Sequence, residues 1–497
     1  MNTSHIVRHR SCYQHFLAVM CAISTATAAI EINVETYGAD AAGLQVAINH
    51  VSGMGGGVVK IPAGVVVSMG GAVVAISTPN VHLKGDGSIK DGTITVGTVS
   101  PNVPVIYNTE IEGITFAFEA LQAGNKAIVL QNAQRGSITN CLFLNCDAAI
   151  SVPPIASPAK RHVAEFRISN NRFEDCNYVL RLDRIGNATT SYVAGDLHFI
   201  NNVAACHICH IYGVGVEGLV INANTFFFPG SSVHSQTKTN NIFLNYCNNI
   251  LITGNNLFEA GADAIELATF QNVSIVGNAI AWPGQRVPGS AIKMKGGAGS
   301  YSMSTIQGNT IMWPTEHGIS LGDDCGYIAV TGNQVRAPGW GDRYYGSTDL
   351  STVPHHGIYA GTATSNITVT GNVFTGAPVK GVNVLGANSQ VSQSGELGSM
   401  TVSASPIDLS GFFGGTVTLA YGAAGTISSI VGGKPGQVVG FCGTNPTMTF
   451  AHSSNLRLKG AVNTTVPINS YLYLKCVNTQ GNTATTGNAW IEVSRNY

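Results

Sequence analysis

The sequence predicts an all-β fold in which short strands wind into a parallel β-helix, a solenoid of stacked coils with a capping helix at its N-terminal end and a small β domain at its C-terminal end. Three observations lead to this prediction. A six-residue pattern with a fixed asparagine recurs through the middle of the chain, and an alternating apolar pattern accompanies each copy. The composition, with 59 Gly and only 10% charged residues among 497, suits tight turns rather than long helices.

The recurring pattern reads apolar, any residue, Gly or polar, Asn, any residue, apolar. Its copies are ISNNRF (168–173), FINNVA (199–204), INANTF (221–226), ITGNNL (252–257), IVGNAI (275–280), IQGNTI (306–311), VTGNQV (330–335) and VTGNVF (369–374). The fixed Asn recurs every 22 to 39 residues, which predicts one coil per interval with loop insertions. Asn tolerates left-handed backbone angles, and its amide can bond to an identical residue one coil away, so we expect an asparagine ladder at one corner.

The alternating element predicts a strand with one buried face, whose outward residues form a file along the solenoid. This predicted file is Arg181, Phe243, Glu266, Lys293, Ser320, Tyr359 and Asn383, with either His210 or Ile211 facing outward in the coil at 206–212. A second file just before the strand is Asn240, Asp263, Ser290, His317 and His356.

The ends of the chain differ from its middle. Residues 41–52 predict an amphipathic helix and 55–66 the first strand. The expected organisation is a signal-like or anchor segment (1–29), an N-terminal cap with the first strands (30–70), the parallel β-helix (71–390), a linker (391–411) and a β-sandwich-like domain for trimerisation or binding (412–497). In segment 1–29, two arginines, the run FLAVMCAI and the site ATA indicate a secretory signal, with a retained anchor helix as the alternative. No later segment is apolar enough to span a bilayer.

Charge and cysteine content exclude several classes of protein. The formal net charge is −1, so no basic excess is available for nucleic acid. Nine of the 11 cysteines follow segment 1–29, an odd and scattered set that favours buried thiols over a disulfide framework. The pair Cys206 and Cys209 lacks a second pair, so we predict no metal and no cofactor.

Two stretches carry a resemblance to known proteins. YGAD (37–40), a helix and GGGVVKIPAG (55–64) resemble the opening of pectate-lyase-like right-handed parallel β-helix proteins. NLRLKGAVN (455–463) and AWIEVSRNY (489–497) are similar to the final module of bacteriophage tailspikes. The resemblance implies a right-handed homotrimer that binds and cleaves bacterial capsule or exopolysaccharide, with a phage tail baseplate or adaptor as a further partner. A tailspike assembles in the host cytoplasm and should carry no signal, so two extracellular locations remain open, on a virion tail or secreted.

The two files bring candidate catalytic residues onto one predicted patch: Asp263, Glu266, Lys293, His317, Asp323, Asp324, His356 and Tyr359. Glycoside hydrolysis requires two carboxylates, and Glu266 and Asp323 lie two coils, roughly 10 Å, apart, near the separation of inverting enzymes. Asp263 and Asp324 are further candidates. The alternative for Glu266 and Lys293 is a surface ion pair between neighbouring coils. Elimination is the rival chemistry, with Lys293, His317 or Tyr359 as base.

Tryptophans form a second line of argument. Trp282 and Trp313 each lie four residues after a fixed Asn, and Trp340 lies in the long insert 336–356. A row of flat apolar faces suits sugar rings, although Trp-Pro can also fill a turn or a subunit contact. The predicted substrate-binding residues are Lys293, His317, His356, Tyr359, Trp282, Trp313, Trp340 and Arg181. The sequence thus predicts a polysaccharide depolymerase acting by hydrolysis, the alternatives being a non-catalytic glycan-binding adhesin or tail fibre and a secreted polysaccharide lyase.

Overall fold

The computed structural model describes most of the chain from residue 30 to residue 495. The described ranges are 30–98, 104–154, 163–183, 194–228, 240–296, 303–322, 324–339, 355–375, 380–385, 389–392, 400–402, 406–409, 415–419, 425–433, 435–443, 448–468, 470–478 and 488–495. The signal-like segment 1–29 and two predicted site residues, Asp323 and Trp340, lie outside the described residues.

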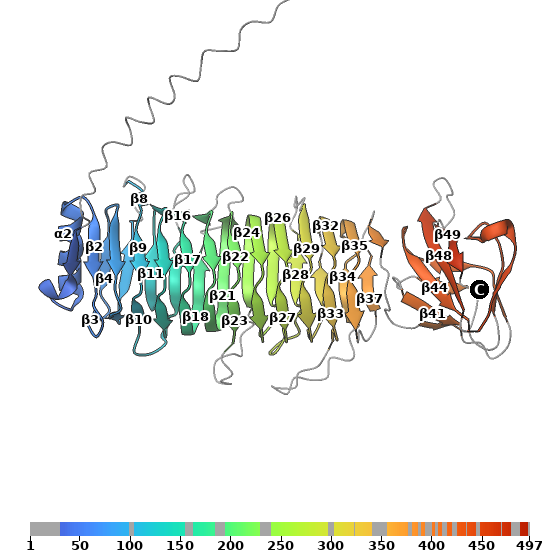
Figure 1. The fold of residues 1–497 in the computed structure, drawn as a ribbon, viewed down its shortest axis with the longest axis horizontal. Coiled ribbons are helices and arrows are strands. Elements are labelled where there is room, and N and C mark those ends of the chain that lie inside the picture. The colour runs from blue at the N-terminus through green and yellow to red at the C-terminus, as the bar shows by residue number, and fades with distance from the viewer. Residues whose placement is uncertain are drawn as a thin grey trace, which may run out of the picture.

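The described strands form a parallel β-helix, in which each strand pairs in register with the equivalent strand of the next coil (Figure 1). Each full coil contributes to three faces. Face 1 runs from β2 (Gly57–Lys60) to β38 (Gln390–Ser392), and face 2 from β3 (Val66–Ser68) to β36 (Val373–Thr375). The parallel solenoid that the asparagine repeat predicts is therefore confirmed.

Face 3 carries the predicted outward file. Its strands are β4 (Val73–Ile76), β7 (Thr93–Val96), β11 (Lys126–Leu130), β15 (Ala148–Val152), parts of β18 (Arg172–Leu182), β21 (Val203–Glu217), β24 (Asn240–Thr253) and β26 (Ile265–Val276), and then β28 (Ile292–Lys295), β31 (Ile319–Leu321), β34 (His356–Ala360) and β37 (Lys380–Val384). The four longest of these strands also continue around a corner onto another face, which ties the faces together.

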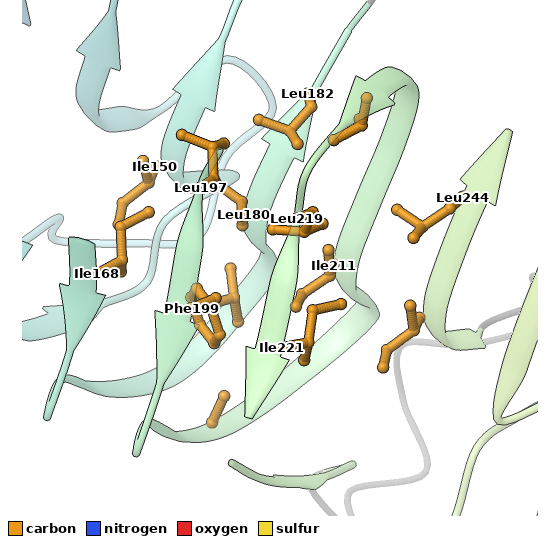
Figure 2. Packing of buried hydrophobic residues seen from close by; sticks show 14 of the residues in the cluster. Ile150, Ile168, Leu180, Leu182, Leu197, Phe199, Ile211, Leu219, Ile221 and Leu244 are labelled. Carbon is orange, nitrogen blue, oxygen red and sulfur yellow. The ribbon is translucent and has the colours of Figure 1, made fainter. Parts of the chain in front are cut away.

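The core lies inside the coils, where equivalent positions repeat the same kind of side chain. The rings of Phe116, Phe143 and Phe173 stack with centroids 5.2 and 4.8 Å apart. Aliphatic and aromatic residues also share a column, as Figure 2 shows for Ile168, Phe199 and Ile221. Because each coil buries its apolar face only against the adjacent coils, stability depends on an unbroken stack.

The asparagine ladder is present at the corner between faces 1 and 2. The side-chain amide of Asn255 donates to Oδ1 of Asn278 at 2.9 Å and to the carbonyl oxygen of Ile221 at 2.9 Å. Its own Oδ1 accepts from the backbone nitrogen and the side-chain amide of Asn224, both at 2.9 Å. The fully buried ladder runs through Asn171, Asn202, Asn224, Asn255, Asn278, Asn309, Asn333 and Asn372. The predicted ladder is confirmed.

The left-handed residue of the corner is not the ladder asparagine, as the sequence suggested, but the residue before it. Gly254 and Gly277 have φ of 63° and 65°, Asn170 and Asn201 have 59° and 57°, and Ala223 has 54°. One left-handed residue is enough to turn the chain, and the next residue then directs its side chain inward. Glycine is common at this preceding position because it adopts positive φ without strain.

A short helix precedes the first coils. Helix α2 (Ala41–Gly53) is capped at its N-terminus by Asp40, whose carboxylate accepts a hydrogen bond from the backbone nitrogen of Gly43 at 2.8 Å. It buries Leu44 and Val51 and lies at the N-terminal end of the stack (Figure 1). The helix predicted over 41–52 is confirmed, and its capping role remains a prediction. The strand predicted over 55–66 is in fact two strands, β2 and β3.

The C-terminal residues have a hydrophobic core of their own. It includes Ile407, Phe441, Phe450 and the fully buried Trp490. Strands β39 (Met400–Val402) and β40 (Ile407–Leu409) pair with later strands, so this part of the predicted linker folds with the C-terminal strands. Within the described residues, no helix has both the length and the apolar character that a membrane span requires.

Candidate functional site

The outward file of face 3 has the register that the sequence predicts. Phe243 pairs with Glu266, Glu266 with Lys293, and Lys293 with Ser320. Ser320 pairs in turn with Tyr359 and Tyr359 with Asn383, which completes the predicted series. Because adjacent coils lie about 4.8 Å apart, the file is a continuous row of side chains.

The coil at 206–212 supplies a different residue from either predicted alternative. Tyr212 pairs with Arg181 on one side and Phe243 on the other, whereas Ile211 and His210 are fully buried. The ring nitrogen Nε2 of His210 lies 3.1 Å from two backbone oxygens. Burial lowers the pKa of His210 to about 3, so it is a neutral core residue. Cys206 and Cys209 are also buried, and the described residues contain no group of three side chains that could hold a metal ion.

A carboxylate cluster surrounds the ammonium group of Lys293. Its Nζ atom lies 3.4 Å from Oδ2 of Asp263 and 3.9 Å from Oε2 of Glu316. Ser290 links the same two carboxylates, since its backbone nitrogen donates to Asp263 at 2.8 Å and its hydroxyl to Glu316 at 3.3 Å. The two carboxylate oxygens beside Lys293 can therefore be no more than about 7 Å apart, a separation compatible with glycoside hydrolysis.

Burial and charge set the protonation of this cluster. Asp263 has no exposed surface, and this burial raises the pKa of its carboxyl to about 6, against the opposing effect of the Lys293 cation and the Ser290 amide. Burial disfavours the charged form of Lys293, but the carboxylates of Asp263 and Glu316 outweigh it and raise the pKa of the amine. At neutral pH, Lys293 is thus a cation beside a carboxyl that can still carry a proton.

Glu266 forms an ion pair with a lysine that the sequence analysis did not consider. Its Oε1 atom lies 2.7 Å from Nζ of Lys295, and its Oε2 accepts from the side-chain amide of Asn240 at 2.8 Å. A direct Glu266–Lys293 ion pair, the alternative that the sequence left open, is not among the described contacts, although the Glu266 carboxylate helps to raise the pKa of the Lys293 amine. Lys295 follows Lys293 by two positions on β28, so alternation places both lysines on the same side of the strand. Lys293 is directed to Asp263 instead.

A stack of rings continues the site into the next coils. Nδ1 of His317 accepts a hydrogen bond from the backbone nitrogen of His356 at 3.0 Å, and the two rings lie parallel with centroids 5.4 Å apart. Tyr359 stacks on His317 at 4.8 Å, and the side-chain amide of Asn383 lies 3.1 Å from Nε2 of His356. Burial, then the neighbouring His356, His355 and Lys293, lower the pKa of His317 to about 3. The structure thus brings together His317, His356 and Tyr359, as the patch predicted.

The tryptophans do not present the expected row of free faces. The rings of Trp282 and Trp313 stack on one another, with centroids 5.1 Å apart and planes 9° apart. The guanidinium carbon of Arg336 lies 5.1 Å from the centre of the Trp313 ring. Faces that were expected to bind sugar rings therefore engage one another and Arg336.

Two further predicted residues lie apart from the carboxylate cluster. Arg181 lies four coils before Lys293 in the file. Its Nε atom lies 2.9 Å from Asp183, and its guanidinium carbon lies 4.8 Å from the ring centre of Tyr178. Asp324 is exposed in the turn between β31 and β32 (Gly326–Thr331). Among the described contacts, none joins Asp324 to Lys293 or its carboxylates.

Three residues of the site were missed by the sequence analysis. Lys295 could have been found from strand alternation, because it follows Lys293 by two positions. Tyr212 could have been found by extending the strand register through the ambiguous coil. Glu316 carries no such signal, since it precedes β31 in a connection without periodicity.

Comparisons with known proteins agree with the fold. The sequence family described as "Right handed beta helix region" matches residues 210–395. A search of curated sequences finds no match. Among solved structures, the catalytic unit of an α-1,3-glucanase from Streptomyces thermodiastaticus aligns over 74% of this chain and 70% of its own, with 14% identity and a TM-score of 0.53.

Two other solved structures align with lower scores. The A-module of a mannuronan C-5 epimerase from Azotobacter vinelandii aligns over 69% of this chain and 98% of its own (15% identity, TM-score 0.46). A tailspike mutant of the Escherichia coli bacteriophage HK620, in complex with a pentasaccharide, aligns over 89% and 82% (12% identity, TM-score 0.47). The family match, the coil register and the glucanase alignment together define the chain as a right-handed parallel β-helix protein.

Proposed function

We propose that this protein binds a polysaccharide along face 3 and hydrolyses it at the carboxylate cluster around Lys293. The observation that carries the proposal is that Asp263 and Glu316 both lie within 3.9 Å of one ammonium group, with Glu266 paired with Lys295 nearby. A solenoid face offers an extended row of side chains to an extended chain of sugars. The glucanase that shares the fold acts on such a polymer, which supports this substrate class.

In this proposal Asp263 is the general acid and Glu316 the second carboxylate. A carboxyl with a pKa raised to about 6 can carry a proton at near-neutral pH and deliver it to the leaving oxygen. Glu316 keeps 30% of its side chain exposed, so it can act on the opposite side of the bond through water or directly. Substrate reaches Asp263 by displacing Lys293, and loss of that cation then favours the protonated acid further.

Two of the three candidate bases for elimination, Lys293 and His317, are poorly suited to that role, which supports hydrolysis. A base needs a free lone pair. Lys293 lies between carboxylates that raise the pKa of its amine, so it stays protonated. His317 is neutral, but its Nδ1 lone pair is taken by the backbone N–H of His356, so its proton lies on Nε2. Neither residue is placed to abstract a proton.

We extend the proposal to the biological setting. The tailspike-like stretches at 455–463 and 489–497 support a bacterial capsule or exopolysaccharide as substrate and a homotrimer acting outside the cell, on a virion or as a secreted protein. Light scattering of the purified full chain tests the trimer, and a mass near 52 kDa, that of one 51.7 kDa chain, would contradict it.

The test of function is a reducing-end assay of the purified chain against a panel of bacterial polysaccharides. We expect new reducing ends without the ultraviolet absorbance of an unsaturated uronate, and loss of activity in Glu316→Gln but not in the exposed control Glu119→Gln. Cleavage with that absorbance would contradict hydrolysis.

One observation favours a second function, a non-catalytic glycan-binding adhesin. Asp263 has no exposed surface and Glu266 is only 5% exposed, as expected of carboxylates that serve to hold Lys293 and Lys295 in place. An adhesin would bind a glycan of the panel, release no reducing ends, and keep its affinity in Glu316→Gln.

A further inference from the structure

The ring stack next to the carboxylate cluster contains one hydrogen-bond donor whose orientation is fixed. A backbone N–H can only donate, so the bond from His356 to Nδ1 of His317 requires that Nδ1 carry no proton. The neutral ring then carries its proton on Nε2. The rings of His356 and Tyr359 lie 1° and 12° from the plane of His317 and hold it in this orientation.

This donor is available to a ligand. His317 is half-buried, and within the described part of the chain its Nε2 atom has no hydrogen-bond partner. Nε2 is also not one of the buried polar atoms that lack a partner, so it remains in contact with solvent. The strand that follows the ring is fixed between its two neighbours, since Ser320 in β31 pairs in register with Lys293 and with Tyr359.

The charges around His317 indicate what the donor can recognise. Both lysines of β28 are already paired with carboxylates, Lys293 with Asp263 and Glu316, and Lys295 with Glu266. Glu316 directly precedes His317 in the chain and would repel an acidic sugar. A neutral N–H beside paired charges suits an uncharged hydroxyl oxygen.

We propose that His317 is a specificity-determining residue, whose Nε2–H donates to a hydroxyl oxygen of an uncharged sugar residue bound beside Lys293. The inference rests on the proposed function of face 3 and adds the class of sugar. The donor itself stays neutral in the range where histidine ordinarily titrates, because burial lowers the pKa of His317. The titratable groups that face the ring are His356, His355, Lys293 and Tyr359. They lie on β28, on β34 or directly before β34.

Two substitutions distinguish the Nε2–H donor of His317 from the hydrogen bond that its Nδ1 accepts from the His356 amide. In His317→Asn, the side-chain oxygen can take the place of Nδ1 and accept from the His356 amide, but nothing replaces Nε2–H. In His317→Gln, the side-chain amide nitrogen reaches the place of Nε2 and restores a donor. His198→Asn, an exposed position on face 1 in β20 (His198–Ile200), is the matched control.

The experiment measures binding of the full chain to an array of neutral and acidic bacterial glycans between pH 5 and 8. We expect neutral glycans to bind, about tenfold weaker binding by the Asn variant, near-recovery by the Gln variant, and no change in the control. Binding of acidic glycans alone, or equal binding by all variants, would overturn the inference while the proposed function stands. No glycan binding by the unaltered chain would overturn both. Equal melting temperatures of the two His317 variants would show that lost affinity is not lost folding.

Discussion

Oδ2 of Asp263 lies 3.4 Å from Nζ of Lys293, and the lysine covers a carboxyl that has no exposed surface of its own. The two side chains come from adjacent coils, so the stacking register brings them within reach of one another. Burial raises the pKa of Asp263, and the Lys293 cation lowers it. The Asp263 carboxylate in turn raises the pKa of the Lys293 amine. This pair therefore sets the pH dependence of any chemistry at the cluster.

The first prediction concerns Asp263 as general acid. Replacing it in Asp263→Asn removes the transferable proton, and we expect kcat to fall at least about 100-fold. In the unaltered protein, kcat/KM should decline as the pH rises through about 6, since the free enzyme loses the acid proton there. The alkaline limb of the pH profile of kcat should lie at higher pH. Bound substrate displaces the Lys293 cation, and loss of that cation raises the pKa of Asp263. Reducing-end rates from pH 4.5 to 8.5 check this, and an Asn variant with full activity would contradict the role.

The second prediction concerns the cation. Lys293→Met keeps most of the unbranched side chain but removes the charge that lowers the pKa of Asp263. The alkaline limb of kcat/KM should then shift to higher pH. In Lys295→Met the charge beside Glu266 is lost instead, so this limb should shift less. Equal shifts in both variants would show that the effect is not specific to the Asp263–Lys293 pair.

The third prediction links the same carboxyl to stability. Because its folded-state pKa is raised to about 6 from 3.8, Asp263 stabilises the fold most below about pH 4, and that contribution is lost as the pH rises through 6. The loss is on the order of 2–3 kcal/mol. Buried His210 and His317 act in the opposite sense, since their pKa values are lowered. The difference in unfolding free energy between Asp263→Asn and the unaltered chain, from urea titrations at pH 4 and 7.5, isolates the effect.

The outcome of that comparison has a definite sign. The Asn variant should gain stability relative to the unaltered chain as the pH rises. A difference that stays constant with pH would mean that Asp263 titrates normally in the folded protein.

The fourth prediction tests the asparagine ladder with neighbouring residues. Asn255→Ala leaves the Ile221 carbonyl and the amides of Asn224 without their buried partner and should cost about 3 kcal/mol or more of unfolding free energy. Asn256, the next residue, points outward and is exposed, so Asn256→Ala should change stability by less than about 0.5 kcal/mol. Thermal unfolding of the pair provides the measurement. Similar losses would indicate that the ladder is not a main source of stability.

The fifth prediction concerns the stacked tryptophans. Trp313→Leu removes contacts with both Trp282 and Arg336, so we expect a loss of about 1–2 kcal/mol in stability. Because ring faces are engaged in these contacts, affinity for glycans should change less than twofold in the same variant. Binding of the folded variant to a glycan array is the check. A tenfold loss of affinity would contradict this prediction and support the sugar-binding role that the sequence suggested for the tryptophans.

The coil register was predictable because it follows from two periodicities, the strand alternation and the interval between asparagines. Glu266 and Lys293 occupy equivalent positions in their strands, so the stacking of coils places them next to one another in the file. The direction of each long side chain was not predictable, because Lys293 had several carboxylates within reach and its choice of Asp263 over Glu266 depends on local burial. Glu316 was missed for a related reason, since connections between strands carry no period.

The asparagine ladder keeps the rise from one coil to the next constant, whatever the number of residues in the coil. Coils of 22 and of 39 residues rise by the same step, since the amide-to-amide bonds fix the spacing whatever the connections between strands add. Segments beside face 3 can therefore be inserted, lengthened or deleted without shifting the strands beneath them. A protein of this kind can change the sugar it meets by exchanging loops while its scaffold stays in place.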